Sequence, residues 1–263
     1  MRISPFVFIA TLAVSSALSQ AAPIRVGIFT GISSGRFWHT NAHTASAAIT
    51  AMLAAPDSSN LGPNLVRATR GFQVSVHGVT TGQGAPNSDQ KAAFLAALDS
   101  LDVVVLNNNV YFPSLFADSA SRARLNAFFR SKGTVSLHFT SDMPTGDWSE
   151  FESLHGTRFM NHPAADRNAT VHLDTAAASD PSWRFLNRGL PDTARFVEEW
   201  ISFTANGGTI RANPGLKVAL RIDEASYENG MGGAIAMGDH PMSWYRPQSG
   251  GGRFFYTGIG HRA

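Results

Sequence analysis

The 263-residue sequence contains no cysteine. Disulfide bonds, a thiolate nucleophile and a lipid-modified leader, which needs a cysteine at its cleavage site, are therefore excluded. Any metal site in this chain has to be built from histidine together with aspartate or glutamate. The chain has nine histidines from which such a site could be drawn.

Charged residues and long apolar runs are also scarce. Charged residues make up 15% of the chain, the formal net charge is +2, and the basic residues form no cluster. We therefore expect no nucleic-acid partner, because such proteins concentrate lysine and arginine on one surface. After the first eighteen residues, no apolar run approaches the roughly 20 residues that a membrane helix needs. We expect no membrane association of the mature chain.

The first 21 residues have the pattern of an export signal. Arg2 is followed by an uncharged apolar segment, Phe6–Leu18, which is too short for a stable membrane anchor. Small residues at positions 19 and 21 fit a signal-peptidase site and predict cleavage after Ala21. The mature chain would then comprise residues 22–263 and be secreted or periplasmic.

The first half of the mature chain alternates between strand-like and helix-like segments. Continuous apolar runs such as "LDVVVLNNN" (101–109) are typical of strands buried on both faces. Strands alternating with helices predict an α/β fold with a parallel sheet between two helical layers. No linker or repeat is evident, which favours one elaborated domain. The expected strands are 23–31, 72–79, 101–109 and 133–138; the expected helices are 43–55, 88–98 and 119–132.

A histidine ends one of these buried strands. "GTVSLHFTSD" (133–142) runs from a glycine through apolar residues to His138 and then into short polar residues. Ligands bind at the carboxyl ends of strands in open parallel sheets, so His138 is a candidate site residue. Two other motifs are weaker. "GISSG" (31–35) lacks the immediate helix of a serine nucleophile elbow, and His39 precedes the helix that contains His43, so the pair would not share one helical face.

The C-terminal third is richer in turns, aromatic residues, carboxylates and histidines. Its motifs include "RFMNHP", "VEEWISF", "RIDEASY", "GDHPMSWY" and "GGGRFFYTGIGH". Aromatic faces stack on sugar rings, and carboxylates and imidazoles bind hydroxyl groups or transfer protons. Each motif alone is more often structural, but together they indicate a carbohydrate site.

Taken in order, these motifs resemble the ThuA-like (trehalose utilisation) family. The resemblance includes Trp38–His39, "LDVVVLNNN", "GTVSLH", "FMNHP", the Glu-Trp segment, "DEASY" and the final "GGGRFFYTGIGH". It implies a fold similar to the class I glutamine amidotransferases: a three-layer sandwich with a mostly parallel, flavodoxin-like sheet and, here, a β-rich C-terminal third. Family members usually continue beyond the position of His261, so we expect that a closing C-terminal segment is missing here.

The resemblance also bears on chemistry. In the amidotransferases the strand corresponding to "GTVSLH" ends in a catalytic cysteine, a position that His138 occupies here, so glutaminase chemistry is excluded. The family implies an enzyme that cleaves or modifies a disaccharide such as trehalose or its keto derivative, as a glycosyl hydrolase or a keto-sugar lyase. A non-catalytic sugar-binding module is the alternative. The expected catalytic residues are His138, Glu199 and Asp239, and the expected substrate-binding residues are His39, Asn108, His162, Trp200, His240, Trp244 and His261.

Two kinds of site remain open from the sequence. Neutral imidazoles suit zinc, which would be bound by His39, His138 and His240 or a nearby carboxylate. Alternatively, the same histidines line a metal-free pocket as hydrogen-bond partners. Two departures from the family pattern stand in "VEEWISF", where Glu198 replaces the usual aspartate and Ile201 replaces a tyrosine. With or without a metal, the expected partner is a small carbohydrate, and the oligomeric state is left open.

Overall fold

The structure is a computed structural model that describes residues 22–37, 39, 42–54, 71–179, 192–205, 210, 213, 215–233 and 236–261. The expected leader and Trp38 lie outside the described residues. No helix among the described residues is long and apolar enough to cross a membrane.

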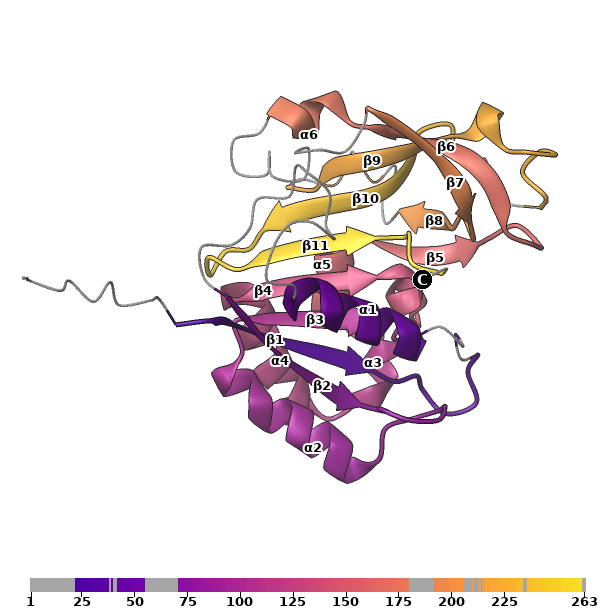
Figure 1. Cartoon of the computed structure of the whole chain (residues 1–263). Helices are drawn as coiled ribbons and strands as arrows, with labels where there is room; N and C mark the ends of the chain where they lie inside the picture. Colours follow the sequence, from indigo (N-terminus) through magenta and orange to yellow (C-terminus); the bar gives the residue numbers. More distant parts are fainter. Residues whose placement is uncertain are drawn as a thin grey trace, which may run out of the picture.

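The elements follow the alternating order that the sequence predicts (Figure 1). The strands are β1 (Ile24–Thr30), β2 (Phe72–Gly78), β3 (Val103–Asn107), β4 (Gly133–Leu137), β5 (Thr157–Asn161), β6 (Arg167–Leu173), β7 (Thr193–Glu198), β8 (Ser202–Ala205), β9 (Lys217–Asp223), β10 (His240–Pro247) and β11 (Arg253–Thr257). The helices are α1 (Ala42–Ala54), α2 (Ser88–Ala97), α3 (Phe112–Leu115), α4 (Ser119–Ser131), α5 (Ser149–His155) and α6 (Thr175–Ser179), with short 3₁₀ turns at Leu98–Ser100, His138–Ser141 and Glu224–Ser226.

The central sheet has nine strands in the order β2-β1-β3-β4-β11-β10-β9-β6-β7. Its first five strands are parallel and follow a flavodoxin-like order, with β11 in fifth place beside β4. The remaining strands are antiparallel and come from the C-terminal part of the chain, and β5 and β8 form a separate ribbon. The predicted fold class is confirmed, including the β-rich C-terminal third.

Alternation along the buried strands builds the two helical layers. Val105 of β3 packs in a cluster with Val26 and Ile28 of β1 and with side chains of α1. Its neighbours Val104 and Leu106 point to the other face, into the larger core that α2 and α4 cover. In Figure 1, α1 lies in front of the sheet, α4 lies behind it and α2 lies below β2. Apolar residues on both faces of β3 therefore hold the sheet between two layers of helices.

The parallel strands all end at the same edge of the sheet. The register pairs Asn107 at the end of β3 with Leu137 at the end of β4, and pairs Leu137 with Thr257 at the end of β11. The residues that follow these strands therefore emerge side by side. This edge, on the right of Figure 1 near the C-terminus, carries the candidate site.

Candidate functional site

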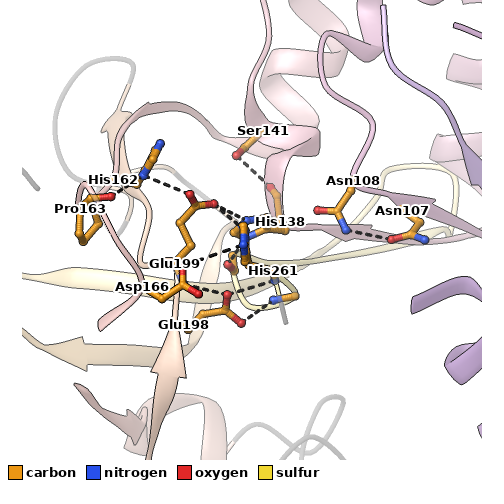
Figure 2. A network of polar contacts seen from close by, with 12 residues as sticks. Asn107, Asn108, His138, Ser141, His162, Pro163, Asp166, Glu198, Glu199 and His261 are labelled. Carbon is orange, nitrogen blue, oxygen red and sulfur yellow. Dashed lines mark hydrogen bonds and ion pairs between the residues drawn. The ribbon is translucent and has the colours of Figure 1, made fainter. Parts of the chain in front are cut away.

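His138 occupies a sharp turn at the end of β4. Its backbone is in the left-handed region, with φ of 44°, and its side chain is fully buried. A left-handed residue other than glycine costs about 1–2 kcal/mol, and such conformations are concentrated at functional sites. The turn directs the imidazole away from the strand axis and toward the loops of the C-terminal third (Figure 2).

The hydrogen bonds of His138 fix its tautomer. Its Nδ1 lies 2.7 Å from the carbonyl oxygen of Gly258, and because a carbonyl can only accept, Nδ1 carries the hydrogen. In the neutral ring, Nε2 then has a lone pair directed at Glu199 Oε2, 3.2 Å away. Two facing lone pairs require a proton or a cation between them. Histidines that bind metals commonly donate their other N–H to a backbone carbonyl in this way.

Glu199 is surrounded by imidazoles. Oε2 lies 3.2 Å from His138 Nε2 and 2.8 Å from His261 Nδ1, while Oε1 lies 3.1 Å from His162 Nδ1. Burial by itself opposes ionisation, but hydrogen bonds from His138 and His261 outweigh it and hold the pKa of Glu199 well below its usual range. Glu199 is therefore an anion with both oxygens in use, as Figure 2 shows.

His39 reaches the cluster from the segment just before α1. Its ring is buried, with its centroid 5.3 Å from that of His138 and 5.1 Å from that of His261. Its Nδ1 has no hydrogen-bond partner among the described residues. Burial, together with the nearby His138 and His261, lowers the pKa of His39 to about 3. The ring is therefore neutral at ordinary pH, which is the form that binds metals.

His261 is held in place by the carboxylate of Glu198. The backbone N–H groups of Gly260 and His261 donate to Glu198 at 3.1 Å each, and the N–H of Glu199 donates to it at 2.9 Å. Glu198 is buried and so fixes two members of the cluster through their backbones. The hydrogen bond with Glu199 raises the pKa of His261, and Asp166 Oδ1 lies 3.9 Å from its Nε2.

Four side chains thus converge as a possible ligand set. Each offers one ligand atom, and these atoms all lie within 4.8 Å of one another. Three imidazoles and a carboxylate match the ligands that zinc prefers when no cysteine is available. The residues are His39, His138, Glu199 and His261.

His240, which the sequence interpretation placed with His39 and His138, does not join this cluster. His240 begins β10, and its Nδ1 lies 2.9 Å from Glu224 Oε1 while its Nε2 lies 2.8 Å from the carbonyl oxygen of Ile201. Both ring nitrogens are therefore in use within the fold. His261 takes the place that the sequence interpretation gave to His240.

The two tryptophans expected to bind substrate belong to the core. Trp200 and Trp244 are fully buried. Their indole N–H groups donate to the carbonyl oxygens of Arg167 at 2.6 Å and His155 at 2.8 Å. No ring face is left for a sugar to stack on, so this expectation is corrected.

Asp239 and Asn108 were also expected at the site, and the structure places only one of them near the end of β4. Asp239 lines a cavity of about 410 Å³ with Glu224 and His240, and does not join the ligand cluster. Asn108 follows β3 as His138 follows β4, in a left-handed conformation with φ of 53°. Its side chain is buried, and its Oδ1 has no partner within the described part of the chain. Asn108 therefore stays a candidate for binding substrate.

Sequence reasoning missed two residues of this site. Glu198 stood out as part of the "VEEWISF" motif and as a departure from the family pattern, but was not expected at the site, and Asp166 did not stand out at all. The signal for Glu198 was a second carboxylate directly before Glu199. For Asp166 it was a carboxylate four residues after His162. Neither signal is specific, because carboxylates in such sequence positions are usually exposed to solvent.

Three solved structures are similar to this chain. A ThuA-like protein from Bacteroides uniformis has a TM-score of 0.59 at 17% identity, covering 91% of this chain and 83% of that chain, which shows the fold. A GMP synthase protein from Thermoplasma acidophilum has a TM-score of 0.41 at 10% identity, with 90% and 83% covered. The CTPS glutaminase domain of Trypanosoma brucei has a TM-score of 0.42 at 11% identity, with 90% and 85% covered.

Family assignment rests on the sequence match. No curated protein matches this sequence. The family described as ThuA, trehalose utilisation, matches residues 25–263. Because this match extends over nearly the whole chain, the protein belongs to the ThuA (trehalose utilisation) family.

Proposed function

We propose that this protein is a metal-dependent enzyme that acts on a disaccharide or its keto derivative. The observation that carries the proposal is the convergence of His39, His138, His261 and Glu199 at the carboxyl edge of the sheet. A binding module would need hydrogen-bond partners for sugar hydroxyls. It would have no reason to place three imidazoles around one buried carboxylate, an arrangement that is unfavourable without a proton or a cation.

A bound divalent cation such as zinc would give the nitrogen and oxygen atoms of the cluster a common partner. It would take the place of the proton between His138 Nε2 and Glu199 Oε2, and it would use the neutral ring of His39. The N–H of His138 already donates to Gly258, and Glu198 fixes the backbone of His261. These contacts match the supporting shell that orients histidine ligands in metal sites.

The arrangement favours elimination from a keto-sugar over direct hydrolysis. Direct glycoside hydrolysis uses two carboxyl groups free to act on substrate, whereas both oxygens of Glu199 are engaged by imidazoles. When bound, the metal would polarise the substrate carbonyl. His162 is the best candidate for the base, since its side chain is 35% exposed. Its Nδ1 donates to the carbonyl oxygen of Pro163 at 2.7 Å and lies 3.1 Å from Glu199 Oε1, so Nε2 is the nitrogen that would take the proton.

In this mechanism, the base takes a proton from the carbon next to the carbonyl. The released electron pair forms a carbon–carbon double bond as the glycosidic C–O bond on the adjacent carbon breaks. The departing oxygen takes up the proton that the base received, so the base is regenerated. Asn108 would bind a sugar hydroxyl beside His138, because its unpartnered Oδ1 is an acceptor.

Elemental analysis and a turnover assay test the proposal together. We expect about one zinc or related divalent ion per chain, lost in His138→Ala and His261→Ala and retained in His172→Ala, which changes a histidine of β6 outside the cluster. Trehalose, other disaccharides and their 3-keto forms are then supplied. Metal binding with release of a monosaccharide from a keto-sugar supports the proposal, whereas tight sugar binding without turnover favours a binding module.

We also propose that the protein is exported and acts outside the cytoplasm. The proposal rests on the leader pattern of residues 1–21. Mass spectrometry of the exported protein should give an N-terminus at Ala22. A retained Met1 in that fraction would contradict the proposal.

A further inference from the structure

A second cavity lies at the opposite end of the sheet from the histidine cluster. It has a volume of about 380 Å³, within the range of about 300–1,000 Å³ typical of small-molecule sites. It lies among the C-terminal half of α4, the helix α5 and the hairpin that joins β10 to β11. In Figure 1 this hairpin is on the left, and the C-terminus beside the histidine cluster is on the right.

Arg246 brings an unbalanced charge into this cavity. Burial lowers the pKa of its guanidinium, and the carboxylate that lines the same cavity, Glu150, is paired with Arg130. One of its nitrogens, Nη1, donates to the carbonyl oxygen of Ser153 at 2.6 Å. A guanidinium has five N–H donors, so most of the fork remains available. Guanidinium forks bind phosphate and carboxylate groups through paired hydrogen bonds.

Other polar groups that can donate hydrogen bonds also line the cavity. The Nε2 of Gln248 is buried and has no partner among the described residues, which is costly for an amide N–H. Ser149 also lines the cavity. Arg130 lies 3.6 Å from Glu150, so two guanidinium groups against one carboxylate leave a net charge of +1.

The glycines of "SGGGR" bring these donors together. Added Cβ atoms at Gly250 and Gly252 would lie 2.7 Å from the carbonyl oxygens of Arg130 and Lys132 respectively, closer than van der Waals contact allows. The N–H of Gly252 donates to the Arg130 carbonyl at 2.9 Å. Glycine is therefore required where the hairpin backbone meets the end of α4. This close approach places Gln248 and Arg246 against the helices that complete the cavity.

From this geometry we propose that the cavity is a binding site for a small oxyanion ligand, one that carries a phosphate or carboxylate group. The Arg246 fork would hold the anion, and the amide of Gln248 would donate to it. Arg130 would add charge at the rim. The site is separate from the histidine cluster, and the proposal does not depend on the function of that cluster.

Isothermal titration of the purified full-length chain tests the site, with inorganic phosphate and succinate as probes at constant ionic strength. We expect saturable binding of at least one probe. Arg246→Gln should weaken it about tenfold or more, as expected for hydrogen bonds to a charged group. Gln248→Glu should also weaken it, by placing a carboxylate against the anion, and covers the case in which Arg246→Gln does not fold.

The matched control is Arg221→Gln, which removes the same charge from an exposed arginine of β9 outside this cavity. It should bind the probes as the unmodified chain does, and circular dichroism checks that each variant is folded. The stronger of the two probes identifies the anionic group. Absence of saturable binding, or binding that survives both cavity variants but is lost in His138→Ala, would overturn the proposal.

Discussion

His155 makes the fold sensitive to acid, and the size of the effect follows from its surroundings. The side chain is fully buried, with ring centroids of Phe151, Phe254 and Tyr256 within 5.2 Å of its own. Its Nε2 lies 3.1 Å from Ser136 Oγ. Burial lowers the pKa of His155 from 6.5 to about 3, because a charged imidazolium would sit among aromatic rings.

The direction and magnitude follow from proton linkage. Below pH 6.5 the unfolded chain binds a proton at His155 and the folded chain does not, so acid favours unfolding until the pH approaches about 3. Between pH 7.5 and pH 5.0 this amounts to about 2 kcal/mol from the two pKa values. The result depends little on the folded value, because at pH 5.0 any folded pKa below about 4 leaves the ring neutral.

Urea unfolding of the unmodified chain and of His155→Gln at the two pH values measures this contribution. Glutamine does not titrate and can still hydrogen-bond to Ser136. We expect the unmodified chain to lose about 2 kcal/mol more stability than the variant on going from pH 7.5 to pH 5.0. His172→Gln, at a half-buried histidine of β6, is the control and should retain the acid sensitivity of the unmodified chain. Equal losses in His155→Gln and the unmodified chain would refute the reasoning.

Three further predictions concern packing and support. Glu198→Ala leaves three backbone N–H groups without their buried acceptor. The free energy of unfolding in urea should fall by about 3 kcal/mol, and zinc occupancy should fall as well. Unchanged occupancy would show that Glu198 does not position the site. Gly78→Ala should cost at least about 1–2 kcal/mol, since φ is +80° and the new Cβ would lie 2.2 Å from the Thr30 carbonyl oxygen; a stability loss below about 0.5 kcal/mol would contradict it. Phe94→Ala should cost about 3–5 kcal/mol, because the ring is fully buried in the core, and a smaller loss would mean that the core closes over the cavity.

The fold of the first half was accessible from the sequence because its signals are local. Apolar runs such as 103–107 read as strands buried on both faces, and the structure buries Val104 and Val105 on opposite sides. The length of each helix, and the glycine that follows its last residue in some cases, are likewise read from neighbouring residues. The C-terminal strands were recognised as short β-like runs, but their order in the sheet was not. Strand order depends on which edges pair over long sequence separations, and no local pattern records that.

The site was only partly accessible, for the same reason. His138 stood out because it ends a buried strand, and His39 because it belongs to the Trp38–His39 pair of the family resemblance. His240 and His261 looked alike in sequence, since each lies beside a turn in a motif of the family. The structure separates them: His240 bonds to Glu224 and the Ile201 carbonyl, whereas His261 reaches Glu199.

The sequence by itself determined the fold class, the exclusion of cysteine chemistry and the presence of a histidine at the carboxyl end of β4. Tertiary structure decided which residues join that histidine. β11 inserts parallel to β4, in the fifth position of the sheet, and carries His261 to the edge where His138 turns. The Glu198 carboxylate then fixes this segment against Glu199. These contacts join residues more than sixty positions apart, so they form only when the whole sheet is packed.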